Sequence, residues 1–174
     1  MEVKIANKER TKCDIDVIDG VTHITITEKI IIERSNFEQR VKVVLFLNNK
    51  SQYEVCKELD ILQGNFLTRC RNGKLNFDEQ RRIADALGCK IVIKFTFGDG
   101  AEYIGKTARQ LIADSCAHAN ITMAELSERL GKSRQTFSSK ILNGRFTDSE
   151  LAEVANKIGC TYSNYFELED GTRI

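Results

Sequence analysis

Hydrophobic positions recur at helical spacing between residues 107 and 158, and the segment 161–168 that follows is rich in aromatic residues, as strands often are. Helices bury residues that lie three or four apart, whereas strands bury every second residue. Short polar or glycine-containing breaks divide the helical part into four segments. The pattern therefore predicts four helices followed by one strand, over 107–119, 122–130, 133–143, 149–158 and 161–168.

The same order of elements is predicted earlier in the chain, at 37–47, 53–59, 63–71, 78–87 and 90–97. Residues 51–100 align with residues 122–171 without a gap, and 12 of the 50 positions are identical. Typical composition would give roughly three identities by chance. We therefore predict a duplicated small domain, with repeat 1 at 34–100 and repeat 2 at 101–174, in which equivalent residues differ by 71 in number.

Residues 1–33 have the alternating pattern of strands instead. Asp19 and Gly20 form a two-residue turn signal between two alternating runs, which is typical of a β-hairpin. We expect strands near 11–18 and 21–33, and residues 2–6 are a candidate for a further strand before them. The fold class that we predict is α+β, mainly α, with an N-terminal β-hairpin followed by two four-helix domains that each end in a strand.

Composition narrows the classes of function. The formal net charge of +1 gives no general attraction to nucleic acid or membrane, so any basic surface must be local. The six cysteines contain no CxxC pair and only two histidines accompany them, so we expect neither a metal site nor a cofactor. Buried reduced thiols are expected instead, and Cys70 takes the repeat position of the aliphatic Ile141. Without an apolar leader or a membrane-spanning run, we expect a cytoplasmic protein that has no contact with a membrane.

The segment 124–145 carries the most specific motif. Leu126 and Leu130 would seat a first short helix, Gly131 would make a sharp turn, and Phe137 and Ile141 would anchor a second helix. This segment closely resembles the helix-turn-helix of the lambda-repressor-like (Cro/C1, XRE-type) DNA-binding family. The resemblance covers about 140 of the 174 residues and includes both repeats. It implies that the second helix of each motif is a recognition helix that enters a major groove of DNA.

The resemblance also implies which side chains would contact DNA. In repeat 2 the base-reading positions would be Arg134, Gln135 and Ser139, with Ser138 nearby and Ser133 at the start of the helix. Phosphate contacts would come from Lys140, Asn143 and Arg145. The matching positions of repeat 1 are Gln63 and Thr68 for bases, with Asn65 nearby, and Arg69, Asn72 and Lys74 for phosphates.

Repeat 1 departs from the family pattern at two positions. Asp60 replaces the turn residue Gly131, and we expect Asp60 to adopt the left-handed backbone conformation that the turn requires. Gly64 stands where repeat 2 has Gln135, so repeat 1 lacks a side chain at a base-reading position. We therefore expect repeat 1 to bind DNA more weakly than repeat 2, or not at all.

The function that this implies is a sequence-specific, DNA-binding transcriptional regulator of repressor type, from a bacterium or a mobile element, with double-stranded DNA as its partner. His23 and His118 have no nucleophile at a recognisable spacing, so we do not expect an enzyme. The alternative is a phage-type protein inhibitor, such as an anti-CRISPR protein, or an adaptor. Its protein partner would bind to repeat 1 or to the N-terminal hairpin, and such a role could coexist with autoregulation through DNA.

The two terminal strands raise a further question about assembly. We expect 90–97 and 161–168 to pair with each other or with the N-terminal hairpin, because exposed strand edges favour aggregation. Pairing within the chain would give an intramolecular pseudo-dimer. The competing arrangement is a homodimer in which these strands pair between two chains.

Overall fold

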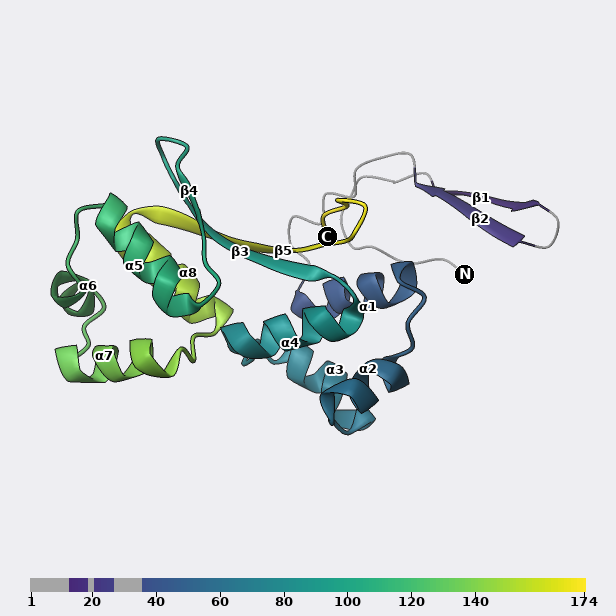
Figure 1. The fold of residues 1–174 in the computed structure, drawn as a ribbon, viewed down its shortest axis with the longest axis horizontal. Coiled ribbons are helices and arrows are strands. Elements are labelled where there is room, and N and C mark those ends of the chain that lie inside the picture. The colour runs from purple at the N-terminus through teal and green to yellow at the C-terminus, as the bar shows by residue number, and fades with distance from the viewer. Residues whose placement is uncertain (1–12, 19–20, 27–35) are drawn as a thin grey trace. The chain divides into compact units, whose positions relative to one another are not determined.

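The computed structural model describes residues 13–18, 21–26 and 36–174, and the chain divides into two compact units, residues 1–34 and 35–174. In the first unit, strand β1 (Cys13–Ile18) pairs antiparallel with strand β2 (Val21–Ile26) (Figure 1). The predicted turn at Asp19 and Gly20, the candidate strand at 2–6 and the outer parts of the predicted strands at 11–12 and 27–33 lie outside the described residues.

The second unit is mainly helical and contains a small antiparallel sheet, so the predicted class of α+β, mainly α, is confirmed. The predicted helices are present, with ends that agree with the prediction or differ from it by one residue. None of the helices in the described ranges is long and apolar enough to cross a membrane. The elements are α1 (Phe37–Leu47), α2 (Gln52–Leu59), α3 (Gln63–Arg71), α4 (Phe77–Leu87), β3 (Lys90–Phe97), β4 (Glu102–Ile104), α5 (Ala108–His118), α6 (Met123–Arg129), α7 (Arg134–Asn143), α8 (Asp148–Ile158) and β5 (Cys160–Glu167).

Polar caps start these short helices. A capping box starts α6: Glu125 Oε2 accepts a hydrogen bond from the Thr122 amide at 2.7 Å, and Thr122 Oγ1 accepts one from the Glu125 amide at 3.1 Å. The equivalent pair at the start of α2, Ser51 and Glu54, forms the same box. Both repeats therefore begin their second helix in the same way.

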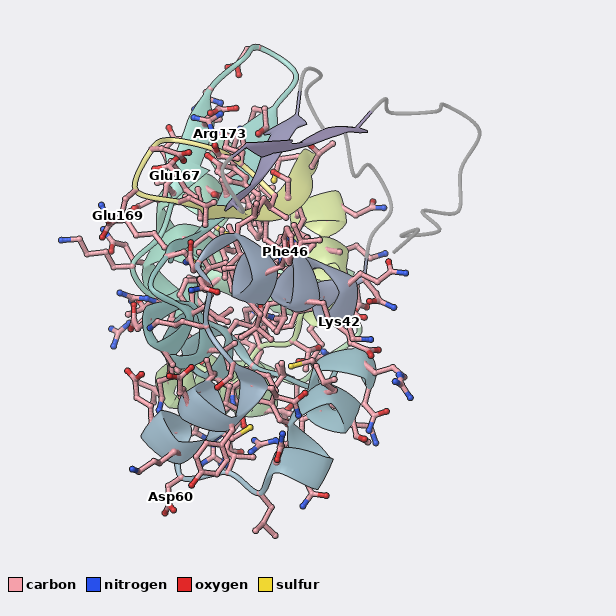
Figure 2. All side chains as sticks on the ribbon, turned by 90° about the vertical axis from the view of Figure 1, so that its right-hand side faces the viewer. Lys42, Phe46, Asp60, Glu167, Glu169 and Arg173 are labelled. Carbon is pink, nitrogen blue, oxygen red and sulfur yellow. The ribbon has the colours of Figure 1, made fainter. Side chains whose placement is uncertain are left out.

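The turn after this helix is left-handed in both repeats. Gly131 has a φ of 64°, and Asp60 has a φ of 55° and a ψ of 47°. The prediction that Asp60 tolerates this conformation is confirmed. Figure 2 shows its side chain pointing away from the body of the unit, and the residue is exposed to solvent.

The sheet has the strand order β4-β3-β5. Strand β3 has the predicted bounds, but β4 was not predicted and lies within the glycine-containing segment 98–105. A turn at Gly100, with a φ of 89°, leads into β4, and the Ala101 amide donates to Asp99 Oδ1 at 2.9 Å. A strand of three residues is too short to show an alternating pattern in the sequence.

The repeats meet through equivalent residues. Strands β3 and β5 pair with each other along their whole length, and the central pair is Ile93 with Asn164, which differ by 71 in number. An isolated bridge joins Asn76 to Thr147, which also differ by 71. Residues that pair with their own equivalents lie on an axis that relates two segments by a half-turn. Strands β3 and β5 are therefore related by an approximate two-fold rotation within the chain.

Each terminal strand packs into the hydrophobic core of the other repeat. Phe95 of β3 is fully buried in a cluster with Leu111, Ile112 and other residues of α5–α8. Its equivalent in β5, Phe166, is fully buried among residues of α1–α4, and its ring centroid lies 5.3 Å from that of Phe37. Figure 1 shows β3 and β5 extending together from one group of helices to the other. The two cores are thus completed by exchange of a strand.

Candidate nucleic-acid interface

Helix α7 has one buried face and one exposed face. The Ser133 hydroxyl caps the helix by accepting a hydrogen bond from the Thr136 amide at 3.2 Å, and Phe137 and Ile141 point into the core. Gly144 ends the helix in a left-handed conformation, with a φ of 65°. All but one of the side chains of this repeat that were expected to contact DNA are exposed, and the exception is Lys140. The exposed residues are Ser133, Arg134, Gln135, Ser138, Ser139, Asn143 and Arg145.

Lys140 is the exception, because it is held against the protein. Its ammonium group forms an ion pair with the Glu150 carboxylate and lies 5.2 Å from the centroid of the Phe146 ring, which leaves the side chain 25% exposed. Glu150 belongs to the capping box of α8, where it also accepts a hydrogen bond from the Thr147 amide at 3.1 Å. Burial raises the pKa of Glu150, but the bonds from Lys140 and Thr147 outweigh it, and the pKa falls below its usual value.

Repeat 1 contains the same link between the equivalent residues. Arg69 forms an ion pair with Glu79 at 2.5 Å, and Glu79 Oε2 accepts from the Asn76 amide at 2.9 Å in the capping box of α4. Two of the four cations that were expected to bind phosphate, Arg69 and Lys140, therefore join α3 and α7 to the helix that follows each of them.

Arg134 is held much less firmly. It forms an ion pair with Glu128 of α6 at 2.9 Å, in which both side chains are exposed to solvent. Pairs of this kind contribute about 0.2–1 kcal/mol. The guanidinium group of Arg134 can therefore leave Glu128 at small cost when a stronger acceptor is offered.

Helix α3 presents a weaker version of the same face. Gln63, Asn65, Thr68, Asn72 and Lys74 are exposed, as expected. The helix lacks a side-chain cap, because the position equivalent to Ser133 is occupied by Leu62. The space around Gly64 is open, since a Cβ atom there would have no neighbour within 4 Å. The missing side chain at this position is thus not required by packing.

Two exposed leucines were not predicted as part of this surface. Leu142 of α7 is 70% exposed, and it lies seven residues after Gln135 and four after Ser138, on the same face of the helix. Leu62 is 77% exposed at the start of α3. Apolar side chains at such positions can contact the methyl group of thymine. The helical spacing of Leu142 was a signal that could have identified it from the sequence.

The remaining reactive side chains have structural surroundings. Five cysteines are free and buried, and burial raises the pKa of Cys70 to about 12. His118 joins the end of α5 to the turn after β3, with Nε2 3.1 Å from Asp99 Oδ2 and Nδ1 3.0 Å from the Tyr103 hydroxyl. Within the described ranges, no group of three or more histidine, cysteine or acidic side chains is placed to hold a metal ion. Cys13 and His23 lie where side chains are not described.

Helices α3 and α7 both lie on the side of the second unit that is opposite β3 and β5, as Figure 1 shows. Their exposed polar faces are formed by equivalent positions of the two repeats. In comparisons with known proteins, no family model, curated sequence or solved structure matches this chain. The function is therefore inferred from the exposed faces of α3 and α7.

Proposed function

We propose that this protein is a sequence-specific transcriptional regulator that binds double-stranded DNA by placing α3 and α7 in successive segments of the major groove. The observation that carries the proposal is the repeated arrangement of an exposed polar helix after a short helix and a left-handed turn. This arrangement is that of a helix-turn-helix, in which the second helix contacts base edges. Repression would follow from occupation of an operator that the polymerase must use.

The approximate two-fold relation supports this proposal. Helix-turn-helix proteins commonly bind DNA as two-fold dimers whose recognition helices contact half-sites about 34–36 Å apart. Here the pairing of β3 with β5 and the bridge between Asn76 and Thr147 provide an equivalent relation within one chain. We therefore favour the intramolecular pseudo-dimer over the homodimer.

Specificity would come chiefly from α7. Arg134 can form two hydrogen bonds to guanine and Gln135 can form two to adenine, and each good pair discriminates by about 1–3 kcal/mol. Phosphate contacts would come from the exposed cations Arg145 and Lys74, which make no ion pair with any residue in the described ranges. With a net charge of +1, the chain has little general attraction to DNA, so binding should depend on these few contacts.

Selection of duplexes from a random library, followed by affinity measurements, tests this function. We expect Arg134→Ala and Gln135→Ala to relax the base preference at one or two positions. Arg145→Ala should weaken binding to all sequences evenly and reduce the salt slope by about 1. Arg109→Ala removes an exposed arginine of α5 and serves as the control, with no expected effect. Enrichment of no sequence, or equal binding by all four variants, would exclude DNA reading by α7.

A second candidate function is supported by exposed apolar residues in repeat 1. Phe46 of α1 is 65% exposed, and Figure 2 shows it at the surface of this helix. Tyr53 of α2 is 63% exposed. In repeat 2, Ala117 takes the position of Phe46 and Ala124 takes the position of Tyr53. Exposed aromatic residues are enriched at protein interfaces. This difference fits an inhibitor or adaptor of phage or mobile-element origin that binds a protein through repeat 1. Loss of protein capture in Phe46→Ala, with unchanged DNA binding, would favour it.

A further inference from the structure

The interface between the repeats has a polar half at one side of its approximate two-fold axis. Asp148 Oδ1 accepts hydrogen bonds from Gln80 Nε2 at 2.7 Å, from Asn164 Nδ2 at 3.0 Å and from the Tyr162 hydroxyl. Arg40 donates from its guanidinium group to the backbone oxygen of Asn164 at 2.8 Å. Arg40 and Gln80 are buried, and we name these five residues the axis polar cluster.

The equivalent residues on the other side of the axis are apolar. They differ from the cluster by 71 in number and lie in one hydrophobic core, with Ile91 packed against its edge. The exchange is complete: every polar residue of the cluster has an aliphatic or aromatic equivalent. In the order Arg40, Gln80, Asp148, Tyr162 and Asn164, the equivalents are Leu111, Leu151, Phe77, Ile91 and Ile93.

This asymmetry decides which surfaces can pair. In the polar half, repeat 1 supplies Arg40 and Gln80, and repeat 2 supplies their partners. Two copies of repeat 1 would instead place Arg40 and Gln80 against aliphatic and aromatic side chains in both halves. Two copies of repeat 2 would place Asp148 beside Leu111 and Leu151 in both halves. Asp148 would keep the hydrogen bonds from Tyr162 and Asn164 of its own repeat but lose the one from Gln80. Buried polar groups without hydrogen-bond partners are strongly unfavourable. The interface therefore accepts one repeat 1 and one repeat 2.

The consequence concerns the two recognition helices, because the pairing of unlike repeats always brings together α3 and α7. Their exposed residues differ at the base-reading positions. Gln63, Gly64 and Thr68 of α3 correspond to Arg134, Gln135 and Ser139 of α7. Gly64 cannot form a hydrogen bond with a base through a side chain, whereas Gln135 can. The two helices therefore differ both in the bases that they favour and in how many they specify.

We propose that a single chain binds a non-palindromic DNA duplex with two unlike half-sites, one for α7 and one for α3, with centres about one helical turn apart. The axis polar cluster maintains this asymmetry by preventing the pairing of like repeats. The inference rests on the proposed DNA-binding function and adds the class of operator and the stoichiometry. The half-site contacted by α7 has more defined positions than the half-site contacted by α3.

Selection from a library with about two helical turns of random sequence tests the proposal, together with the mass of the complex by light scattering. We expect one chain per duplex and a motif with two dissimilar halves. Duplexes that contain the α7 half-site twice, or the α3 half-site twice, as an inverted repeat should bind the chain at least tenfold more weakly than the selected duplex. A palindromic motif bound by two chains would overturn this inference but leave the DNA-binding function intact. Enrichment of no sequence would overturn both.

A variant of the interface provides an independent readout. Arg40→Leu combined with Gln80→Leu gives repeat 1 the side chains of repeat 2 at these positions, so that two copies of repeat 1 become compatible. It also leaves Asp148 without Gln80. We expect this double variant to form dimers whose fraction rises with protein concentration. The control variant, Arg109→Leu combined with Gln110→Leu, makes the same two substitutions at exposed positions of α5, and we expect it to remain monomeric. A double interface variant that stays monomeric and as stable as the parent would overturn the role of the cluster.

Discussion

The exchange of terminal strands leads to a prediction about a single phenylalanine. Phe166 belongs to β5 of repeat 2, yet its ring is fully buried against α1, where it contacts Phe37 and Arg40. Burying a phenylalanine side chain stabilises a protein by about 1.5–3 kcal/mol, and the cavity left by Phe166→Ala raises the total loss to about 3–5 kcal/mol. Phe166→Leu fills most of this space and should cost less than about 1.5 kcal/mol.

The core that Phe166→Ala perturbs distinguishes strand exchange from an arrangement in which each strand packs within its own repeat. Phe166→Ala should shift the methyl resonances of Val41 and Val44, which share its core, and leave those of Leu111 and Ile112 largely unchanged. The matched variant is Phe95→Ala, at the equivalent position, which should have the opposite pattern. Urea unfolding followed by circular dichroism gives the loss of stability for both variants. If Phe166→Ala perturbs the core of α5–α8 and spares that of α1–α4, the exchange is refuted.

Four further substitutions test local features of the fold. Because Asp60 and Gly131 adopt the same left-handed conformation, Asp60→Gly should stabilise the protein by up to about 1 kcal/mol and Gly131→Ala should destabilise it by about 1 kcal/mol or more, in urea unfolding. Gly64→Ala adds a methyl group in open space within α3 and should stabilise by up to about 1 kcal/mol, and a loss of stability would contradict this. Hydrogen bonds from Arg71 lower the pKa of Glu38 from 4.5 to about 2, so the stabilisation is present above pH 4.5 and is lost as the pH falls towards 2. Unfolding measured against pH should have a smaller acid dependence in Glu38→Gln.

Much of the local structure could be predicted from the sequence. The ends of α3 and β3 agree with the prediction, because caps, glycines and hydrophobic spacing act over a few neighbouring residues. The left-handed turn at Asp60 could be predicted because the alignment places it at the position of Gly131. These features depend on residues that lie close together in the sequence, so a local pattern is enough to predict them.

The contacts between the repeats could not be predicted in the same way. Asp148 looks like an ordinary solvated residue at the start of a helix, and only the packing of β5 brings Tyr162 and Asn164 to it. Phe95 and Phe166 lie in strands that were predicted, but a strand pattern does not tell which core the strand completes. Lys140 was predicted to contact phosphate because the family resemblance places such a contact at its position. Its ion pair with Glu150 depends on the angle between α7 and α8, which no local pattern specifies.

The most direct test of the account is the affinity of the parent protein for its selected duplex, compared with a scrambled duplex of the same composition at one fixed salt concentration. If α7 and α3 contact base edges, the selected duplex should bind at least about a thousandfold more tightly, which is the lower end of the range for specific DNA-binding proteins. Replacing Arg134 and Gln135 together by alanine should remove most of this preference. Equal affinity of the parent protein for the two duplexes would contradict the proposal that this chain recognises a DNA sequence.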